Sequence, residues 1–187
     1  MNTIAFIVQQ TMLFSIPLLI VALGGMYSER SGVINIGLDG GMIMGAFTGT
    51  VFINAMQGSM SGQGLYVLAL LIAGLTGLIF VIFHAFASIN LKANQVISGT
   101  AMNMFAPAFA VFAGRLIFGT QQVPFRDTFF IRSIPLLGDI PIIGPLLFQR
   151  CYISTFIGIF IFFVAWFVIQ RTPFGLRLRA CGEHPGA

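Results

Sequence analysis

Four long stretches without a charged residue dominate this chain, at 1–28, 40–91, 93–114 and 151–170. A membrane-spanning helix needs about 20 apolar residues with a rise of about 1.5 Å each, so every stretch is long enough for at least one crossing. Nine Lys and Arg with five Asp and Glu are too few to cover a water-soluble core of this size. The chain is therefore predicted to be all-α, a polytopic transmembrane helix bundle.

Hydrophobicity divides the chain into membrane segments of one transmembrane domain. Five are predicted, at 4–27, 33–56, 65–89, 95–118 and 151–170. The first has no Lys or Arg before it and is longer than a signal-peptide apolar region of about 7–15 residues, so we expect it to remain as a helix.

The basic residues indicate how the segments are oriented. If the five segments alternate, Arg30, Lys92 and Arg171 lie on one side, while the 57–64 loop on the other side is uncharged. By the positive-inside rule the basic side is the cytoplasm. The N-terminus is then outside, 119–150 is an extracytoplasmic loop and 171–187 is cytoplasmic. If segment 33–56 re-enters the membrane instead of crossing it, the N-terminus lies inside.

The basic residues occur singly at the ends of apolar runs, which argues against nucleic acid as a partner. The charge pattern indicates instead how the chain is oriented in a membrane.

Small residues recur every four positions in three segments. The rows are Gly37, Gly41, Gly45 and Gly49; Ala69, Ala73 and Gly77; and Ala106, Ala110 and Gly114. Helices associate in lipid through such smooth faces, so these rows are predicted to be packing faces. Phe47 lies about 200° from Gly45 around a helix and is expected to face lipid.

Two polar runs enter the membrane at the cytoplasmic side. Asn35 and Asp39 lie in a glycine-rich run at 31–41, which is a candidate for broken or irregular helix. Asp39 is either a first-turn residue stabilised by the helix dipole or a functional carboxylate. The second run, at 94–103, either lines a solute path or bonds to a neighbouring helix. Its polar candidates for the path are Asn94, Gln95, Ser98 and Asn103.

No catalytic or metal-binding motif is visible. Cys151 and Cys181 flank a helix of about 27–30 Å and cannot form a disulfide, and the two histidines have no metal-ligand spacing. An intramembrane serine protease built on Ser98 and His84 remains a weaker alternative. A non-transporting membrane scaffold is another.

The C-terminal stretch begins with Thr172 and Pro173, which suit a helix cap and a first helical turn. Gly182 is expected to break this helix, and Pro185 is expected to start another. A helix start followed by so few residues predicts that the chain is part of a longer protein.

Three runs resemble the permease subunits of bacterial ABC importers for simple sugars, nucleosides and branched-chain amino acids. They are GGMYSERSGVINIGLDGGM at 24–42, NQVISGTAMN at 94–103 and FGLRLRACGEHPGA at 174–187. The middle run resembles the nucleoside and simple-sugar branch. Asp39 stands where such permeases more often have Glu, and His184 where they have Asn.

The resemblance implies uptake of a small polar solute, a nucleoside or a simple sugar, through the N-terminal portion of such a permease. The implied partners are a second permease subunit, an extracytoplasmic solute-binding protein and a cytoplasmic ATPase. The chain has no phosphate-binding glycine-rich motif ending in Lys-Ser/Thr, so ATP is expected on the ATPase and no cofactor on this chain. The coupling residues implied by the third run are Arg177, Arg179, Glu183, His184, Pro185 and Ala187.

Overall fold

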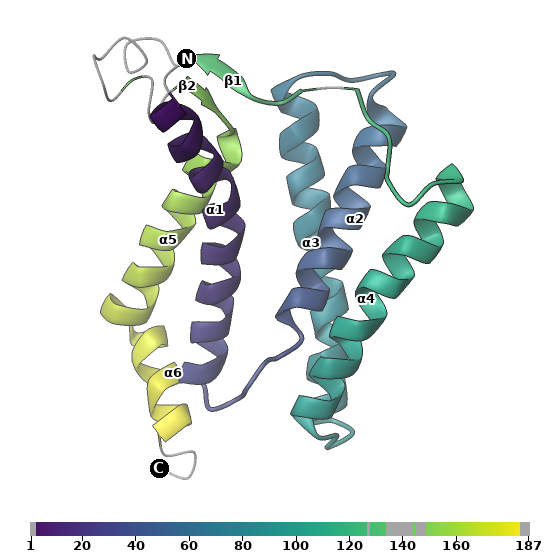
Figure 1. Ribbon diagram of the computed structural model, residues 1–187. Coiled ribbons are helices and arrows are strands. Elements are labelled where there is room, and N and C mark those ends of the chain that lie inside the picture. The colour runs from purple at the N-terminus through teal and green to yellow at the C-terminus, as the bar shows by residue number, and fades with distance from the viewer. Residues whose placement is uncertain (1–2, 127, 134–143, 145–148, 184–187) are drawn as a thin grey trace. The chain divides into compact units, whose positions relative to one another are not determined.

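The computed structural model describes residues 3–126, 128–133, 144 and 149–183. In this part of the chain, six helices and a small antiparallel sheet follow one another (Figure 1). They are α1 (Thr3–Arg30), α2 (Leu38–Met56), α3 (Gln63–Ile89), α4 (Gln95–Phe118), β1 (Ile131–Ser133), β2 (Gln149–Cys151), α5 (Ile153–Arg171) and α6 (Pro173–Glu183). The predicted all-α helix bundle is confirmed.

Helices α1, α3, α4 and α5 are each long and apolar enough to cross a membrane. Helix α2 has 19 residues and at about 1.5 Å per residue is almost as long as a bilayer core of about 30 Å is thick. It is less apolar because it contains Asp39 and four glycines. The prediction of about five membrane segments, one of them unusual, agrees with these helices.

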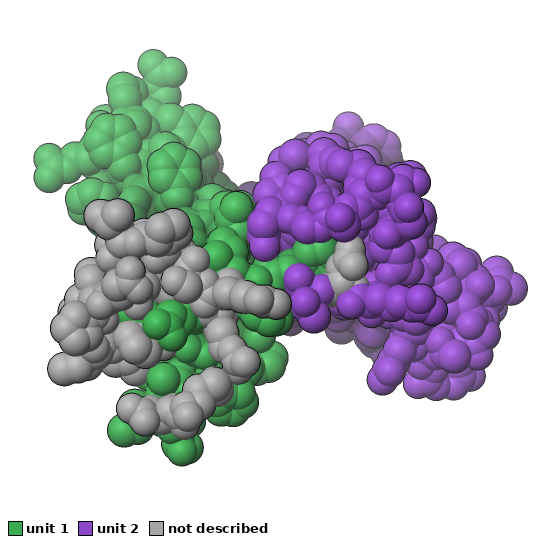
Figure 2. Space-filling view, turned by 90° about the horizontal axis from the view of Figure 1, so that it is seen from above, with its two compact units in different colours: residues 1–31, 129–187 green, residues 32–128 purple. Residues whose placement is uncertain are grey.

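The chain forms two compact units, coloured separately in Figure 2: residues 1–31 with 129–187, and residues 32–128. In the second unit, α2 packs against both α3 and α4. Glycines make the contact with α3 close: a Cβ built on Gly45 would lie 2.6 Å from the Ala73 carbonyl oxygen, and one on Gly49 would lie 3.1 Å from the Ala73 Cβ. Only glycine at position 45 allows the two backbones to approach this closely.

In the first unit, α1 and α5 lie side by side (Figure 1). Gly158 of α5 provides the space for the Ile16 side chain of α1. The Tyr27 hydroxyl donates a hydrogen bond of 2.7 Å to the Ala165 carbonyl oxygen. These contacts join segments that are far apart in sequence.

The ends of the last helices differ in part from expectation. The Thr172 hydroxyl accepts a hydrogen bond from the Gly175 N–H at 3.3 Å, and α6 begins at Pro173, so the expected cap is confirmed. Gly182, however, lies within α6, which continues to Glu183. The predicted break at Gly182 is wrong, because one glycine in a last turn costs only about 1 kcal/mol.

Two other expectations also need correction. The last membrane segment was predicted to begin at Cys151. Cys151 instead belongs to β2, where it pairs with Ile131 of β1, and the last long helix begins at Ile153. Phe47 does not simply face lipid: it is half-buried, and its ring meets the Phe109 ring edge-on at a centroid distance of 6.4 Å. Three-residue strands are too short to show an alternating sequence pattern. The angular position of Phe47 on its own helix does not reveal whether side chains of a neighbouring helix reach that side.

Candidate functional site

The chain entering α2 is irregular and lies against α4. Residues 33–35 have no regular secondary structure, and Gly32 has a φ of +81°. The Asn35 side-chain oxygen accepts a hydrogen bond of 3.0 Å from the Gly37 N–H. The segment 33–56 is therefore helical only from Leu38 onward.

Asn103 of α4 holds this irregular entry. Its side-chain nitrogen donates to the Ile36 carbonyl oxygen at 2.7 Å, and its side-chain oxygen accepts from the Gly40 N–H at 2.8 Å. One amide thereby satisfies a free acceptor and a free donor at the start of α2. Irregular backbone at membrane depth needs such protein partners, because lipid offers none.

Glycines bring α4 close enough for this contact. A Cβ on Gly99 would lie 2.9 Å from the Gly37 backbone nitrogen, and one on Gly40 would lie 2.8 Å from the Met102 carbonyl oxygen. Gly37 therefore lies at the α4 contact, whereas Gly41, Gly45 and Gly49 lie against α3.

The other polar residues predicted for a path have different surroundings. Asp39 is exposed in the first turn of α2, where the helix dipole favours a negative charge. Asn94 is the N-cap of α4, because its side-chain oxygen accepts from the Val96 N–H at 2.9 Å. Gln95, the first residue of α4, is half-buried. In the described part of the chain, the Asp39 carboxylate makes no hydrogen bond to either of them.

Ser98 pairs with a histidine of α3. The Ser98 hydroxyl oxygen lies 3.0 Å from His84 Nδ1, and His84 is 4% exposed. This distance is also the one that a serine nucleophile and its base require. A catalytic histidine is held by a third group, however, and no described residue hydrogen-bonds to His84 Nε2. The pair is a hydrogen bond between two membrane helices.

Helix α6 carries the basic residues predicted for coupling. Arg177 is exposed, and the Arg179 side chain donates to the Gly175 carbonyl oxygen within the helix at 3.4 Å. Glu183 is exposed at the end of α6. His184, Pro185 and Ala187, which the third run also implied, lie outside the described residues.

The three runs 24–42, 94–103 and 174–183 thus include the irregular entry, the start of α4 that holds it, and α6. The family described as the branched-chain amino acid transport system / permease component matches residues 7–187. The chain belongs to this permease family. The resemblance noted in the sequence is confirmed.

Two relatives of this permease match nearly the whole chain. The Bacillus subtilis guanosine ABC transporter permease protein NupQ is 43% identical over 187 residues, which cover 98% of this chain and 58% of NupQ. The Lactococcus lactis nucleoside ABC transporter permease protein NupC is 38% identical over 186 residues, which cover 100% of this chain and 58% of NupC. The chain thus spans little more than half the length of these relatives. No solved structure matches it.

Family membership and the four apolar helices make this permease an integral, multi-pass protein of the plasma membrane. Its relatives are named as permease proteins of ABC transporters, which are transport subunits and not catalytic ones.

Proposed function

We propose that this permease is part of the membrane subunit of an ATP-driven importer for nucleosides. The observation that carries the proposal is the identity of 43% and 38% to two permeases named for guanosine and for nucleosides, over almost all of the chain. The middle run at 94–103 supports the same branch. Uptake of a simple sugar is the second candidate, because the same resemblance includes sugar permeases.

The chain acts by changing its shape and has no chemistry of its own to perform. ATP binds and is hydrolysed on a separate cytoplasmic ATPase, a second permease subunit completes the membrane path, and an extracytoplasmic binding protein delivers the solute. Helix α6, with Arg177 and Arg179, leads into the segment that contacts the ATPase, together with Glu183, His184, Pro185 and Ala187. Residues 171–187 are accordingly cytoplasmic, in agreement with Arg171 at the end of α5.

The polar residues at the cytoplasmic ends of α2 and α4 have two roles. Asn35, Asn94 and Asn103 shape the backbone, since their side chains all bond to backbone groups. Asp39, Gln95 and Ser98 line the inner part of the solute path. Asp39 is exposed, and placing a carboxylate against lipid costs about 2.5–3.5 kcal/mol on insertion scales. We therefore expect Asp39 to contact water or a partner subunit.

Reconstitution tests this proposal. The product of the complete gene, purified with its ATPase and placed in proteoliposomes, should take up radiolabelled guanosine only when ATP and the binding protein are present. Radiolabelled ribose serves as the comparison. Faster uptake of ribose than of guanosine would replace the nucleoside by a sugar, and absence of ATP-dependent uptake of either would favour a membrane scaffold.

A further inference from the structure

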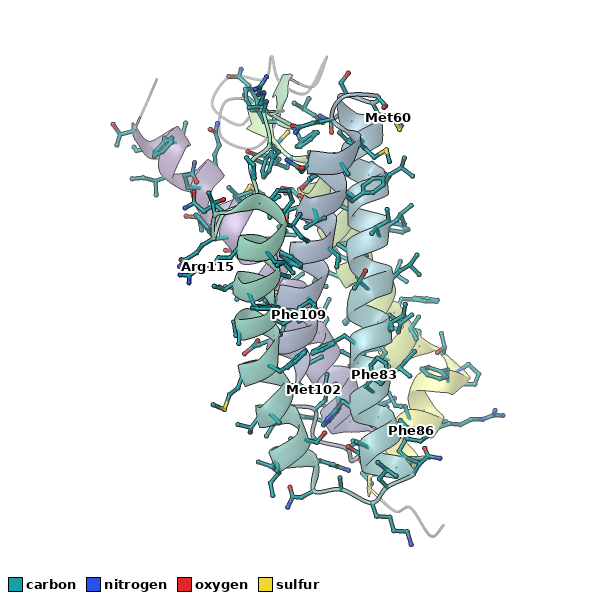
Figure 3. The ribbon with its side chains drawn as sticks, turned by 90° about the vertical axis from the view of Figure 1, so that its right-hand side faces the viewer. Met60, Phe83, Phe86, Met102, Phe109 and Arg115 are labelled. Carbon is teal, nitrogen blue, oxygen red and sulfur yellow. The ribbon has the colours of Figure 1, made fainter. Side chains whose placement is uncertain are left out.

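The second unit contains an open cavity of about 590 Å³ along α3 and α4. Its lining includes four phenylalanines, one methionine of α4 and one serine: Phe80, Phe83, Phe105, Phe109, Met102 and Ser98. Figure 3 looks onto this face, where Met102 and Phe109 from α4 and Phe83 from α3 lie near one another. None of the four phenylalanines belongs to a run that indicated a function.

Three of the phenylalanine rings form two nearly parallel pairs that share Phe105. The Phe105 ring is nearly parallel to the Phe80 ring, with an interplanar angle of 16° and a centroid distance of 6.3 Å. It is also nearly parallel to the Phe109 ring, at 24° and 5.5 Å. Phe105 remains 54% exposed, so the part of its ring that Phe80 and Phe109 leave uncovered can contact a further planar group.

One end of the cavity is polar. Ser98 lines the cavity and shares its hydroxyl with His84 Nδ1. His84 is almost fully buried, and its Nε2 has no hydrogen-bond partner among the described residues. In one tautomer the Nε2–H lacks an acceptor, and in the other the Nε2 lone pair lacks a donor while the Ser98 hydroxyl is free to donate. His84 is not among the residues that line the cavity, so the Ser98 hydroxyl is the group of this pair to which a polar ligand in the cavity can bond.

The aromatic rings and the polar end of the cavity together determine which kind of ligand fits it. A lipid tail covers aromatic rings but offers no hydrogen bond to Ser98 or His84. A free sugar can place a C–H face on Phe105, but it has no planar ring, and its several hydroxyls would meet one polar lining residue, Ser98. A nucleoside has both a planar base and polar edges, and bases stack on aromatic side chains.

We propose that this cavity is a nucleoside-binding site on the transport path, in which the base stacks on Phe105 and a polar edge hydrogen-bonds to the Ser98 hydroxyl, which His84 holds in place. This inference rests on the proposed function and adds the place and the chemistry of recognition. Ser98 and Phe109 are 11 positions apart on α4, or about 16 Å along the helix, so the site extends from its inner end to its middle.

The test uses the complete transporter in proteoliposomes with its ATPase and binding protein. Phe105→Ala should lower the rate of guanosine uptake about tenfold, the size expected for one lost stacking contact. Ser98→Ala should lower it several-fold, and Phe105→Tyr, which keeps the ring, should not. Phe86→Ala is the matched control, since Phe86 is 53% exposed on α3 and is not part of the cavity lining.

A second measurement keeps the inference testable if a variant folds poorly. A photoreactive azido-purine nucleoside, added to the wild-type transporter, should label peptides from 80–84 or 98–109. Labelling confined to other segments, or equal guanosine uptake by Phe105→Ala, Ser98→Ala and Phe86→Ala, would overturn the site and leave the proposed function intact. If the wild-type transporter takes up no nucleoside at all, both fail together.

Discussion

The Asn103 side chain pairs two backbone groups at the start of α2 that would otherwise pair with other backbone groups in a regular helix. Its amide pairs with the Ile36 carbonyl oxygen and the Gly40 N–H, on either side of the point where α2 begins. A polar residue at this position is visible in the sequence, but its two partners lie more than 60 positions away. Spacing along one helix cannot identify such partners, because they depend on how close Gly99 lets α4 approach.

Replacing Asn103 should destabilise the second unit. In Asn103→Ala both backbone groups lose their partner, and each unpaired group costs about 1–3 kcal/mol. We expect a clearly lower melting temperature of the purified permease in detergent. Met104→Ala is the control, because Met104 is the next residue and is 71% exposed. Equal melting temperatures for the two variants would show that the Asn103 bonds do not hold α2.

The two cysteines should differ in their reaction with a membrane-impermeant maleimide. Cys181 is exposed on α6, and it should react only after cells are opened, because 171–187 is proposed to be cytoplasmic. Cys151 is buried, and burial raises the pKa of its thiol, so less of the reactive thiolate is present at neutral pH. Its labelling should be slow and should increase only at alkaline pH. Rapid labelling of Cys181 in intact cells would reverse the proposed topology.

At the scale of helices, α2 and α3 fit together in an antiparallel register. Gly41 lies near Gly77, Gly45 near Ala73, and Gly49 near Ala73 and Ala69. Two rows of small residues identified separately in the sequence thus lie against each other. The contribution of the glycine row of α2 to the stability of the permease stays a prediction.

An added side chain should separate these helices. In Gly45→Leu the new Cβ alone would come within 2.6 Å of the Ala73 carbonyl oxygen, so the backbones must move apart. We expect loss of the folded permease during detergent extraction, measured by size-exclusion chromatography. Ala46→Leu adds a bulky side chain to the neighbouring, exposed position and should be tolerated. If both variants behave alike, the glycine row has no packing role.

The long helices could be predicted well from the sequence. The short strands, and the contacts between residues far apart in the chain, could not. The predicted segment 95–118 coincides with α4, since Asn94 caps its start and Gly119 adopts a left-handed conformation with a φ of +71° at its end. Strands β1 and β2 went unnoticed because three residues are too few to show a pattern. The polar entries at 31–41 and 94–103 were visible, whereas the group of rings that lines the cavity was not, because the rings come from two different helices, α3 and α4.

At the scale of the whole molecule, this chain matches 58% of the length of its nucleoside relatives. The described part ends in α6, an exposed helix with Arg177 near its middle and Glu183 at its end. These residues lie where the membrane subunit is proposed to meet its ATPase. Substitutions there should affect energy coupling and leave solute recognition unchanged.

Replacing Glu183 and Pro185 together should uncouple ATP hydrolysis from transport. In the complete transporter we expect ATPase activity that is no longer stimulated by solute, together with slow uptake. The affinity of the separate binding protein for its solute should be unchanged. Cys181→Ser, at an exposed position on the same helix, is the control. Normal uptake and normal recovery of the ATPase in a pull-down by the double variant would contradict the docking role.

Uptake by intact cells tests the central claim most directly. A strain lacking the complete gene should accumulate radiolabelled guanosine at a much lower rate than its parent, and the complete gene supplied on a plasmid should restore the rate. Restoration should fail when the partner ATPase carries an inactivating substitution at its nucleotide site. Unchanged guanosine accumulation in the deletion strain, with no other nucleoside affected, would contradict the account.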